Sequence, residues 1–331
     1  GRIGAMHAET LSRLLAPGEL VVADLDEERA RTLAVAVGAE AASIDEAIAG
    51  ADALVIAASS NAHSELIRAG IDHKLPIFCE KPLSISLDET SALVDEIEAS
   101  GIRFQLGFQR RFDPAYVEAR RRFVAGDLGI VYLVRMVASD HAPPPEAYIP
   151  TSGGVFRDSS IHDFDAIRWM TGSEVESVYA DGDARGFEML ARHDDVGTVA
   201  VVLRMRNGIL GVLGGGRHNP PGYDIRMELI GSRDTVAMGL TDRTPIVPLD
   251  APMRPMRPGW DSFIDRFEQA YRDELRAFVQ VARGEAASAC TARDGLEAMR
   301  IAEAASRSLV ERRPIDLDEI IEGEKEVEPA S

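Results

Sequence analysis

The chain has little cysteine, no long hydrophobic run, and fewer basic than acidic residues. Only Cys79 and Cys290 occur among 331 residues, which excludes a disulfide framework or a cysteine-built zinc site and fits a reducing cytoplasm. No apolar run approaches the roughly 20 residues that span a bilayer, so we expect no membrane partner. The 36 Lys and Arg residues against 55 Asp and Glu give a net charge of −19, which argues against a nucleic-acid partner.

The first third of the chain alternates short apolar runs with amphipathic stretches. The apolar runs predict strands at 19–26, 51–59, 75–81 and 102–109, and the stretches between them predict helices at 26–38, 43–50, 63–73 and 86–101. Gly38 and Gly101 mark helix ends, and Ser43 with Glu46 has the spacing of a capping box. Strands that alternate with helices indicate parallel βαβ units, and therefore an α/β doubly wound (Rossmann) parallel sheet.

After residue 112 the pattern changes to strands joined by hairpins. Asn207-Gly208 joins two apolar runs and predicts a type I′ hairpin, and residues 223–240 predict a second hairpin. Helices are predicted at 114–127, at 162–172 and in two long stretches near the end, and residues 319–331 are interpreted as a solvated acidic tail. We therefore expect two domains, 1–112 and 113–331, the second being α+β with an open antiparallel sheet.

The opening residues have part of the spacing of a dinucleotide-binding fingerprint. Gly1 and Gly4, with Arg2 and Ile3 between them, match the second and third glycines of G-x-G-x-x-G, whose backbone approaches a pyrophosphate at a helix N-terminus. Asp24 lies 20 residues after Gly4 at a strand end, where a carboxylate binds the ribose hydroxyls of NAD and repels the 2′-phosphate of NADP. An ordinary turn role for Asp24 is the alternative. The first strand is missing from the pattern, and we expect about ten further residues upstream, apolar and then Gly-x.

Two further motifs suggest chemistry. Lys81, in "FCEKPLS", follows a predicted strand at the edge where open α/β sheets bind ligands. In "GGVFRDSSIHDFD" (153–165), Asp158 and His162 have i, i+4 spacing, which places both side chains on one face of an α-helix. That pair is compatible with catalysis, with a metal site or with Asp158 capping a helix.

Four segments in this order resemble one known family. They are "GRIGAMHAETL", "EKPLS", "GFQRRFDP" and "SGGVFRDSSIHDFDAIRWMTG", and they resemble the glucose–fructose oxidoreductase, inositol dehydrogenase and rhizopine-catabolism (Gfo/Idh/MocA) family from Gly1 to about Asp318. The loop before Asp165 is most similar to that of bacterial inositol 2-dehydrogenases. The resemblance implies an NAD(P)-binding Rossmann domain, a C-terminal domain with an open sheet, and a homo-oligomer, tetramer or dimer, formed through the outer face of that sheet.

The resemblance also implies a set of site residues. The family's catalytic Lys, Asp and His fall on Lys81, Asp158 and His162. Its cofactor-binding positions fall on Gly1, Arg2, Ile3, Gly4, Asp24, Ser59, Ser60, His63, Glu80, Lys81 and Gln109. Its substrate-binding positions fall on Arg110, Asp165 and Tyr223, and His141 in the proline-rich loop is a further candidate. The family implies no metal.

These positions suit the oxidation of an alcohol. Histidine has a pKa near neutrality, so we expect His162 to accept the hydroxyl proton, with Asp158 as its partner and Lys81 polarising the reacting oxygen. The expected activity is NAD-dependent oxidation of a cyclic polyol, myo-inositol to its 2-keto product. Another inositol isomer, a pyranose or an anhydrosugar is the alternative substrate, and a non-catalytic NAD-sensing protein is the alternative of another class.

Overall fold

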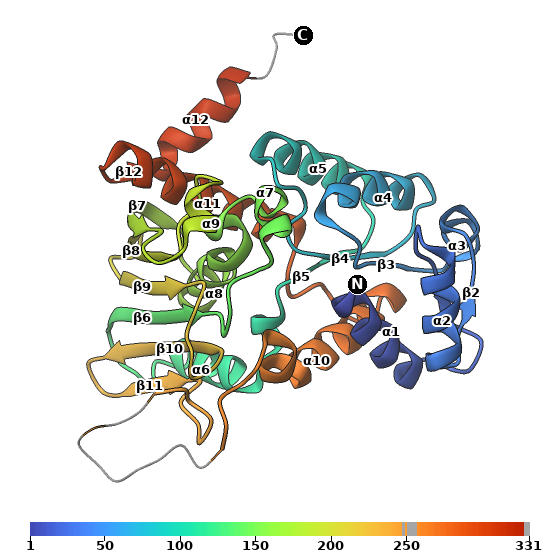
Figure 1. Cartoon of the computed structure of the whole chain (residues 1–331), viewed down its shortest axis with the longest axis horizontal. Helices are drawn as coiled ribbons and strands as arrows, with labels where there is room; N and C mark the ends of the chain where they lie inside the picture. The colour runs from blue at the N-terminus through green and yellow to red at the C-terminus, as the bar shows by residue number, and fades with distance from the viewer. Residues whose placement is uncertain (247–248, 250–256, 328–331) are drawn as a thin grey trace. The chain divides into compact units, whose positions relative to one another are not determined.

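The computed structural model describes residues 1–246, 249 and 257–327, and the chain divides into two compact units (Figure 1). The first unit comprises 1–112 and 269–296, and the second comprises 113–268 and 297–331. The first division falls where the domain boundary is expected. Residues 269–296 fold with the first unit, however, although the sequence places them in the second domain. The reason is that helix α10 (Phe263–Arg283) contributes apolar side chains to the first core.

The first unit has short parallel strands separated by helices. Its elements are α1 (Arg2–Leu14), β1 (Val21–Val22), α2 (Glu27–Val37), β2 (Glu40–Ala41), α3 (Ile44–Gly50), β3 (Leu54–Ile56), α4 (Ser60–Asp72), β4 (Ile77–Glu80), α5 (Leu87–Ser100), β5 (Phe104–Gly107) and the 3-10 turn η1 (Gln109–Phe112). The strands form two parallel sheets, β1–β2 and β3–β4–β5. This is the predicted α/β arrangement, with β1 much shorter than its apolar run.

Local sequence signals account for several helix boundaries in this unit. Ser43 and Glu46 form the predicted capping box at the start of α3. Gly38 and Gly101 adopt left-handed conformations after α2 and α5, with φ of 71° and 66°. Glycine reaches that conformation without the steric cost that a Cβ imposes, so it ends both helices.

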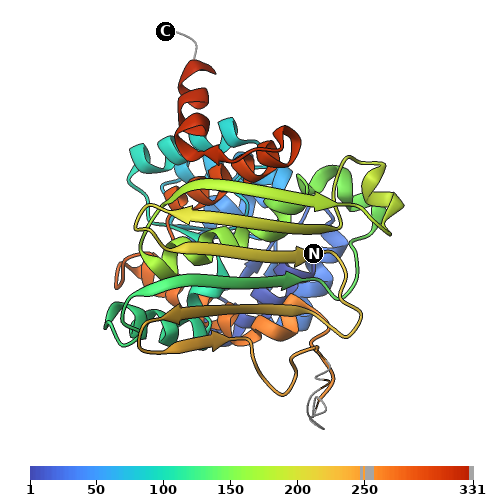
Figure 2. The ribbon, with the colours of Figure 1, turned by 90° about the vertical axis from the view of Figure 1, so that its left-hand side faces the viewer.

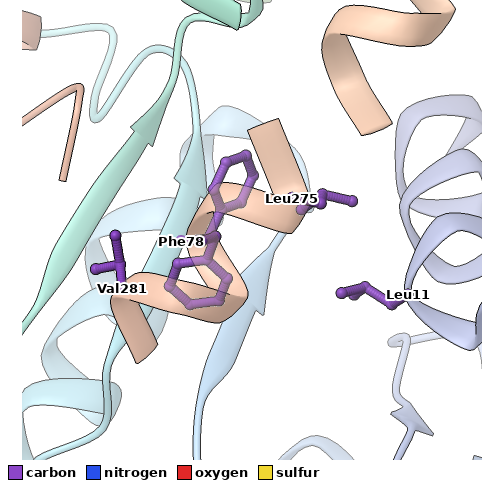
Figure 3. Close-up of a cluster of buried hydrophobic side chains, with 5 residues drawn as sticks. Leu11, Phe78, Leu275 and Val281 are labelled. Atoms are coloured by element: carbon purple, nitrogen blue, oxygen red, sulfur yellow. The ribbon is translucent and has the colours of Figure 1, made fainter. Parts of the chain in front are cut away.

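The core of the first unit joins α1, β4 and α10. Leu11, Phe78, Leu275, Phe278 and Val281 form a buried cluster, of which Figure 3 labels four members. Phe78 lies at its centre, with its ring centroid 5.7 Å from that of Phe278. The cluster fixes the position of β4, the strand that leads to Lys81.

The second unit is built on a seven-stranded sheet, seen face-on in Figure 2, with the order β11-β10-β6-β9-β8-β7-β12. The strands are β6 (Val131–Ser139), β7 (Val175–Asp183), β8 (Thr198–Met205), β9 (Leu210–Gly216), β10 (Asp224–Gly231), β11 (Thr235–Met238) and β12 (Ile315–Asp316). The sheet is mostly antiparallel, as predicted. Its exception is the parallel pair β6–β9, which a long connection between residues 139 and 210 permits.

Helices and turns complete the second unit. They are α6 (Pro114–Val124), η2 (Glu146–Tyr148), α7 (Ile149–Ser152), η3 (Phe156–Ser160), α8 (Ile161–Thr171), α9 (Glu188–Ala191), α11 (Ala292–Glu311), which begins in the first unit, and α12 (Leu317–Val327). Helix α8 packs closely on the sheet, because a Cβ on Gly211 of β9 would lie 2.6 Å from Ile167 Cδ1.

Two local predictions are wrong. The loop after Met205 is not a type I′ turn, because among the described non-glycine residues positive φ occurs only at Lys74, Asp194 and Arg312, and not at Asn207. Gly208 alone is left-handed, and Met205 pairs with Ile209 around a three-residue loop. The acidic segment after residue 316 is helix α12 rather than a tail. It is held by buried Ile320 and by the pair Arg300–Glu324, and residues 328–331 lie outside the described residues.

Candidate functional site

One group of candidate site residues, all in the first unit, lies at the carboxyl ends of three parallel strands. Ser59 and Ser60 follow β3 and begin α4, Lys81 follows β4 directly, and Gln109 follows β5 in η1. Open α/β sheets bind ligands at this edge, so the fold brings these predicted residues to the expected place within the first unit. The peptide bond between Lys81 and Pro82 is cis.

Glu80, the residue before Lys81, is fixed by contacts that sequence reasoning missed. Its Oε1 lies 2.6 Å from Nε2 of the buried residue His7, on α1. On its other side β5 pairs Gly107 with Glu80, and a Cβ on Gly107 would lie 3.0 Å from Glu80 Oε2. Glycine at this position therefore leaves room for the carboxylate, and the orientation of Glu80 is set from two elements.

His63 fixes the chain on the other side of Lys81. It is buried, with Nδ1 2.7 Å from the Pro82 carbonyl and Nε2 3.3 Å from the Ala58 carbonyl. Burial lowers the pKa of His63, against the smaller opposing effect of the two carbonyls. A neutral imidazole has one N–H, and the shorter distance assigns it to Nδ1, donating to Pro82. His63 is thus a link between the loops after β3 and β4, whereas the family resemblance assigns it a cofactor contact.

The predicted cofactor residues at the start of the chain fit a dinucleotide. Gly1 is the N-cap of α1, so the first N–H groups of that helix lie at Arg2 and Ile3, where a phosphate is favoured. A Cβ on Gly4 would be 3.5 Å from the Ala57 carbonyl, so the helix start lies against the end of β3. Both features suit a bound pyrophosphate.

Asp24 follows β1 and is half-buried. Its Oδ1 accepts a hydrogen bond from the Asp26 amide at 3.0 Å, which is the turn role considered as the alternative. Within the described ranges Oδ2 accepts no hydrogen bond. One carboxylate oxygen is therefore available to ribose hydroxyls while the other holds the turn.

Two buried polar side chains follow β5. Gln109 is 2% exposed, and its Oε1 has no hydrogen-bond partner among the residues that the structure covers. A buried amide oxygen without a donor is costly unless a ligand supplies one, so Gln109 fits a cofactor or substrate contact. Arg110, a predicted substrate residue, is next to it in the same unit and is 3% exposed.

In the second unit, the segment that carries Asp158 and His162 begins with a distorted helix start. Gly153 and Gly154 both have positive φ, 78° and 83°, which explains the Gly-Gly pair. Residues Phe156–Ser160 then form a π-helical turn before α8. A π-helical turn has i→i+5 hydrogen bonds, so the i, i+4 spacing of an α-helix does not hold through it. The prediction that Asp158 and His162 share one α-helical face is therefore wrong. Single π-turns of this kind are frequent at functional sites.

The carboxylate of Asp158 has two identified donors. The guanidinium of Arg217 donates from Nη1 to Oδ2 at 2.7 Å, and the hydroxyl of Tyr148 donates to Oδ1 at 3.0 Å. Burial and the Asp158 carboxylate raise the pKa of Tyr148, so the phenol remains a donor. The N-caps of η3 and α8 are Val155 and Ser160, so the helix-cap alternative for Asp158 is wrong.

The other predicted residues of the second unit have separate surroundings. His162 is half-buried at the start of α8, and Asp165 is 1% exposed on the same helix. Tyr223 is buried before β10, where its amide donates to the Trp260 carbonyl at 2.7 Å. His141 follows β6 and is partly exposed, with Nδ1 3.9 Å from Asp261.

His7 and Arg217 were missed because each is defined by a partner far away in sequence, and Tyr148 was missed because the sequence does not show that its hydroxyl meets Asp158, ten residues further on. His7 lies 73 residues from Glu80, and Arg217 lies 59 residues from Asp158. The only available signal was position, since His7 is inside the fingerprint segment and Tyr148 is inside the loop that resembles inositol dehydrogenases.

The described residues contain neither a metal-binding cluster nor a membrane-spanning helix. No group of three or more His, Cys, Asp or Glu side chains in the described part of the chain could hold a metal ion. Across the same ranges, no helix has the length and apolar character needed to cross a bilayer.

Both units match known protein families. Residues 1–108 match the oxidoreductase family with an NAD-binding Rossmann fold, and residues 116–237 match the GFO/IDH/MocA C-terminal domain. Together these matches cover most of the chain, in agreement with the resemblance drawn from its motifs.

Individual relatives agree over nearly the whole length. The chain is 43% identical to the myo-inositol dehydrogenase Hyg17 of Streptomyces leeuwenhoekii, covering 93% of this chain and 94% of that protein. It is 35% identical to the myo-inositol 2-dehydrogenase of Thermotoga maritima, covering 97% of each. The crystal structure of scyllo-inositol dehydrogenase from Lactobacillus casei with bound NAD(H) and scyllo-inositol superposes with a TM-score of 0.85 at 26% identity, covering 96% of this chain and 97% of that one.

Proposed function

This chain belongs to the GFO/IDH/MocA family of oxidoreductases with an NAD-binding Rossmann domain, and from that premise we propose that it oxidises myo-inositol to 2-keto-myo-inositol with NAD. The observation that carries the proposal is the position of Lys81 and the way in which its two neighbouring residues are held. A lysine follows β4 at the ligand-binding edge of a parallel sheet, and buried histidines hold the residues on both sides of it. Relatives named for inositol oxidation support the choice of substrate.

NAD would be held in the first unit by the start of α1, by Asp24 and by the edge that carries Gln109. Its nicotinamide supplies the acceptor for the hydride that leaves the substrate carbon. The remaining chemistry belongs to side chains of this protein, because the hydroxyl must lose a proton as its carbon loses the hydride.

The ammonium of Lys81 donates a hydrogen bond to the reacting hydroxyl and stabilises the negative charge that develops on its oxygen. An imidazole nitrogen of His162 accepts the hydroxyl proton, and Asp158 stabilises the imidazolium that results. Arg110, His141, Asp165 and Tyr223 are proposed to bind the flanking hydroxyl groups. The products are a ketone, NADH and a proton, which balances the reaction.

The substrate is tested by following NADH absorbance with purified protein and a panel of polyols. The panel comprises myo-, scyllo- and D-chiro-inositol, glucose and levoglucosan. We expect the highest kcat/KM with myo-inositol. A higher kcat/KM with another member of the panel would make that compound the substrate and leave the proposed alcohol oxidation unchanged. A protein that binds NAD and oxidises none of them would instead be a non-catalytic NAD sensor, and the proposal would be wrong.

The preference for NAD over NADP is proposed to rest on Asp24. A carboxylate at this position repels a 2′-phosphate, so Asp24→Ser should raise kcat/KM with NADP⁺ and lower it with NAD⁺. Wild-type protein that turns over faster with NADP⁺ than with NAD⁺ at equal low concentration would contradict this role.

Two properties of the intact protein complete the proposal. The buried residues Cys79 and Cys290 form no disulfide within the described part of the chain, which suits the reducing cytoplasm.

The outer face of the large sheet presents Tyr179, Val202 and Val212 as cross-strand neighbours on β7, β8 and β9, between 37% and 46% exposed. An apolar row on an uncovered sheet face suits association into a homotetramer.

A further inference from the structure

Arg217, which is not among the predicted site residues, is a buried arginine surrounded by carboxylates. This arginine follows β9 and is only 2% exposed. Its Nη1 lies 2.7 Å from Asp158 Oδ2 and 3.8 Å from Asp140 Oδ2, and its Nη2 lies 3.7 Å from Asp195 Oδ2. One buried cation therefore stands among three carboxylates that come from three separate segments of the second unit.

The shortest of these contacts is to the proposed catalytic carboxylate. Arg217 Nη1 also lies 2.9 Å from the hydroxyl oxygen of Ser159, so the guanidinium spans two consecutive residues of the π-helical turn. The remaining oxygen of Asp158 accepts from Tyr148. Because both carboxylate oxygens accept a hydrogen bond from different elements, rotation of the carboxylate is restricted.

The charges of the cluster explain why an arginine is needed. Burial of a carboxylate favours its protonated form, and a cation in contact favours the ionised form. Burial lowers the pKa of Arg217, while Asp158, Asp140 and Asp195 raise it, and the net direction is upward. The guanidinium is therefore a permanent charge, and neutral replacements would leave three carboxylates facing one another.

Asp195 links this cluster to the start of the π-helical turn. Its Oδ1 accepts from the amides of Val155 at 3.0 Å and Val196 at 2.9 Å, while its Oδ2 lies beside Arg217. Arg217 therefore contacts the π-helical turn in two ways. It contacts the Asp158 side chain directly, and it lies beside Asp195, which accepts a hydrogen bond from the backbone amide of Val155.

We propose that Arg217 is a positioning residue for the oxidation, which holds the Asp158 carboxylate ionised and fixed in orientation, with Tyr148 as the second donor. The proposal rests on the proposed function, because it concerns what Asp158 does in that reaction. Arg217 acts through Asp158, so its contribution to kcat exists only while the carboxylate is present.

The test is a double-mutant cycle on kcat with myo-inositol and NAD⁺. Arg217→Gln should lower kcat by about ten- to a hundredfold, as expected for losing a hydrogen bond to a charged group, with the Kd for NAD⁺ little changed. In the Asp158→Asn background the same substitution should lower kcat by less than about threefold, because coupled residues are not additive. Arg217→Lys, which keeps the charge, should recover part of the loss.

Arg168→Gln is the matched control. Arg168 is a 7% exposed arginine on α8, with Nε 2.5 Å from Oε2 of the half-exposed Glu174, so its substitution also removes a buried guanidinium from an ion pair in the same unit. It should change kcat by less than about threefold, and equally with and without Asp158. Melting temperatures of all variants separate loss of folding from loss of positioning.

Tyr148→Phe keeps the proposal testable if Arg217→Gln does not fold, because it removes only one hydroxyl. It should lower kcat in the wild-type background and not in the Asp158→Asn background. Equal losses from Arg217→Gln, or from Tyr148→Phe in its place, in both backgrounds would overturn the positioning role while leaving the proposed function intact. A wild-type protein that oxidises no polyol would overturn both.

Discussion

The Nε2 atom of His7 lies 2.6 Å from Oε1 of Glu80, and the pair is buried between α1 and β4. His7 Nδ1 is also buried and has no hydrogen-bond partner within the described residues, so a neutral ring that donates from Nε2 satisfies the pair at the least cost. The ring packs edge-on against Phe78, with centroids 5.5 Å apart. The first helix is therefore coupled to the residue that precedes Lys81.

His7→Leu should lower the free energy of unfolding by about 2–4 kcal/mol, because it leaves a buried carboxylate without its donor. Urea denaturation measures the change. The control is Glu9→Ala, on the exposed side of the same helix, which should cost less than about 0.5 kcal/mol. Equal losses in the two variants would show that the His7–Glu80 contact contributes nothing specific.

Gly107→Ala should impair catalysis more than folding. A Cβ at this position would lie 3.0 Å from Glu80 Oε2, 3.1 Å from Phe78 Cζ and 3.2 Å from Glu80 Cα, and the last of these is backbone. Accommodating it displaces the residue next to Lys81, so we expect kcat to fall about tenfold or more, with about 1–3 kcal/mol lost from stability.

Gly50→Ala is the comparison for that substitution, because no atom lies within 4 Å of the added Cβ. It should leave kcat unchanged. Steady-state kinetics on both proteins decide the matter, and a Gly107→Ala enzyme with wild-type kcat would contradict the proposed fixation of Glu80 and Lys81.

The lowered pKa of His63 predicts a pH dependence of stability. Burial lowers this pKa in the folded state, so folding favours the neutral ring. The contribution is fully present above the unfolded value of about 6.5 and is lost as the pH falls through the lowered folded value. Relative to His63→Asn, which does not titrate, the wild type should lose stability between about pH 7.5 and pH 5.

The measurement is the free energy of unfolding in urea at a series of pH values, taken as the difference between the two proteins. His73→Asn, at an exposed histidine that follows the same helix, is the control and should show no such difference. A wild type that gains stability relative to His63→Asn on acidification would reverse the assigned sign.

Val212→Asp should dissociate the proposed tetramer. Val212 lies between Val202 on β8 and Arg135 on β6, in a row across the outer sheet face. Burying a carboxylate there on assembly would cost several kcal/mol, on the order of 3 or more. Light scattering after size-exclusion chromatography gives the mass. Val124→Asp, at an exposed valine that ends α6, should leave the mass unchanged. A monomeric wild type would rule out association through this face.

The sequence predicts features that depend on neighbouring residues better than features that depend on distant ones. Helices that begin at Ser43 and end at Gly38 or Gly101 are correctly placed, because caps and left-handed glycines act locally. The acidic C-terminal segment was misread because the contacts that stabilise it, such as Arg300–Glu324, join residues 24 positions apart.

The same distinction applies to the candidate site. Lys81 could be placed at the sheet edge, because the end of its strand is visible as the end of an apolar run. The π-helical turn at Asp158 could not, since its residues have no distinct local pattern. The donors to Asp158 come from η2 and from the end of β9, which only the folded chain brings to the carboxylate.

The most direct test of the account is the initial rate of NADH formation from myo-inositol and NAD⁺ by Lys81→Ala and His162→Ala enzymes. We predict that each lowers kcat by about 10²–10⁴-fold, the usual contribution of a general acid–base group, with the Kd for NAD⁺ little changed. Activity within about threefold of wild type in either variant would contradict the roles assigned to Lys81 and His162.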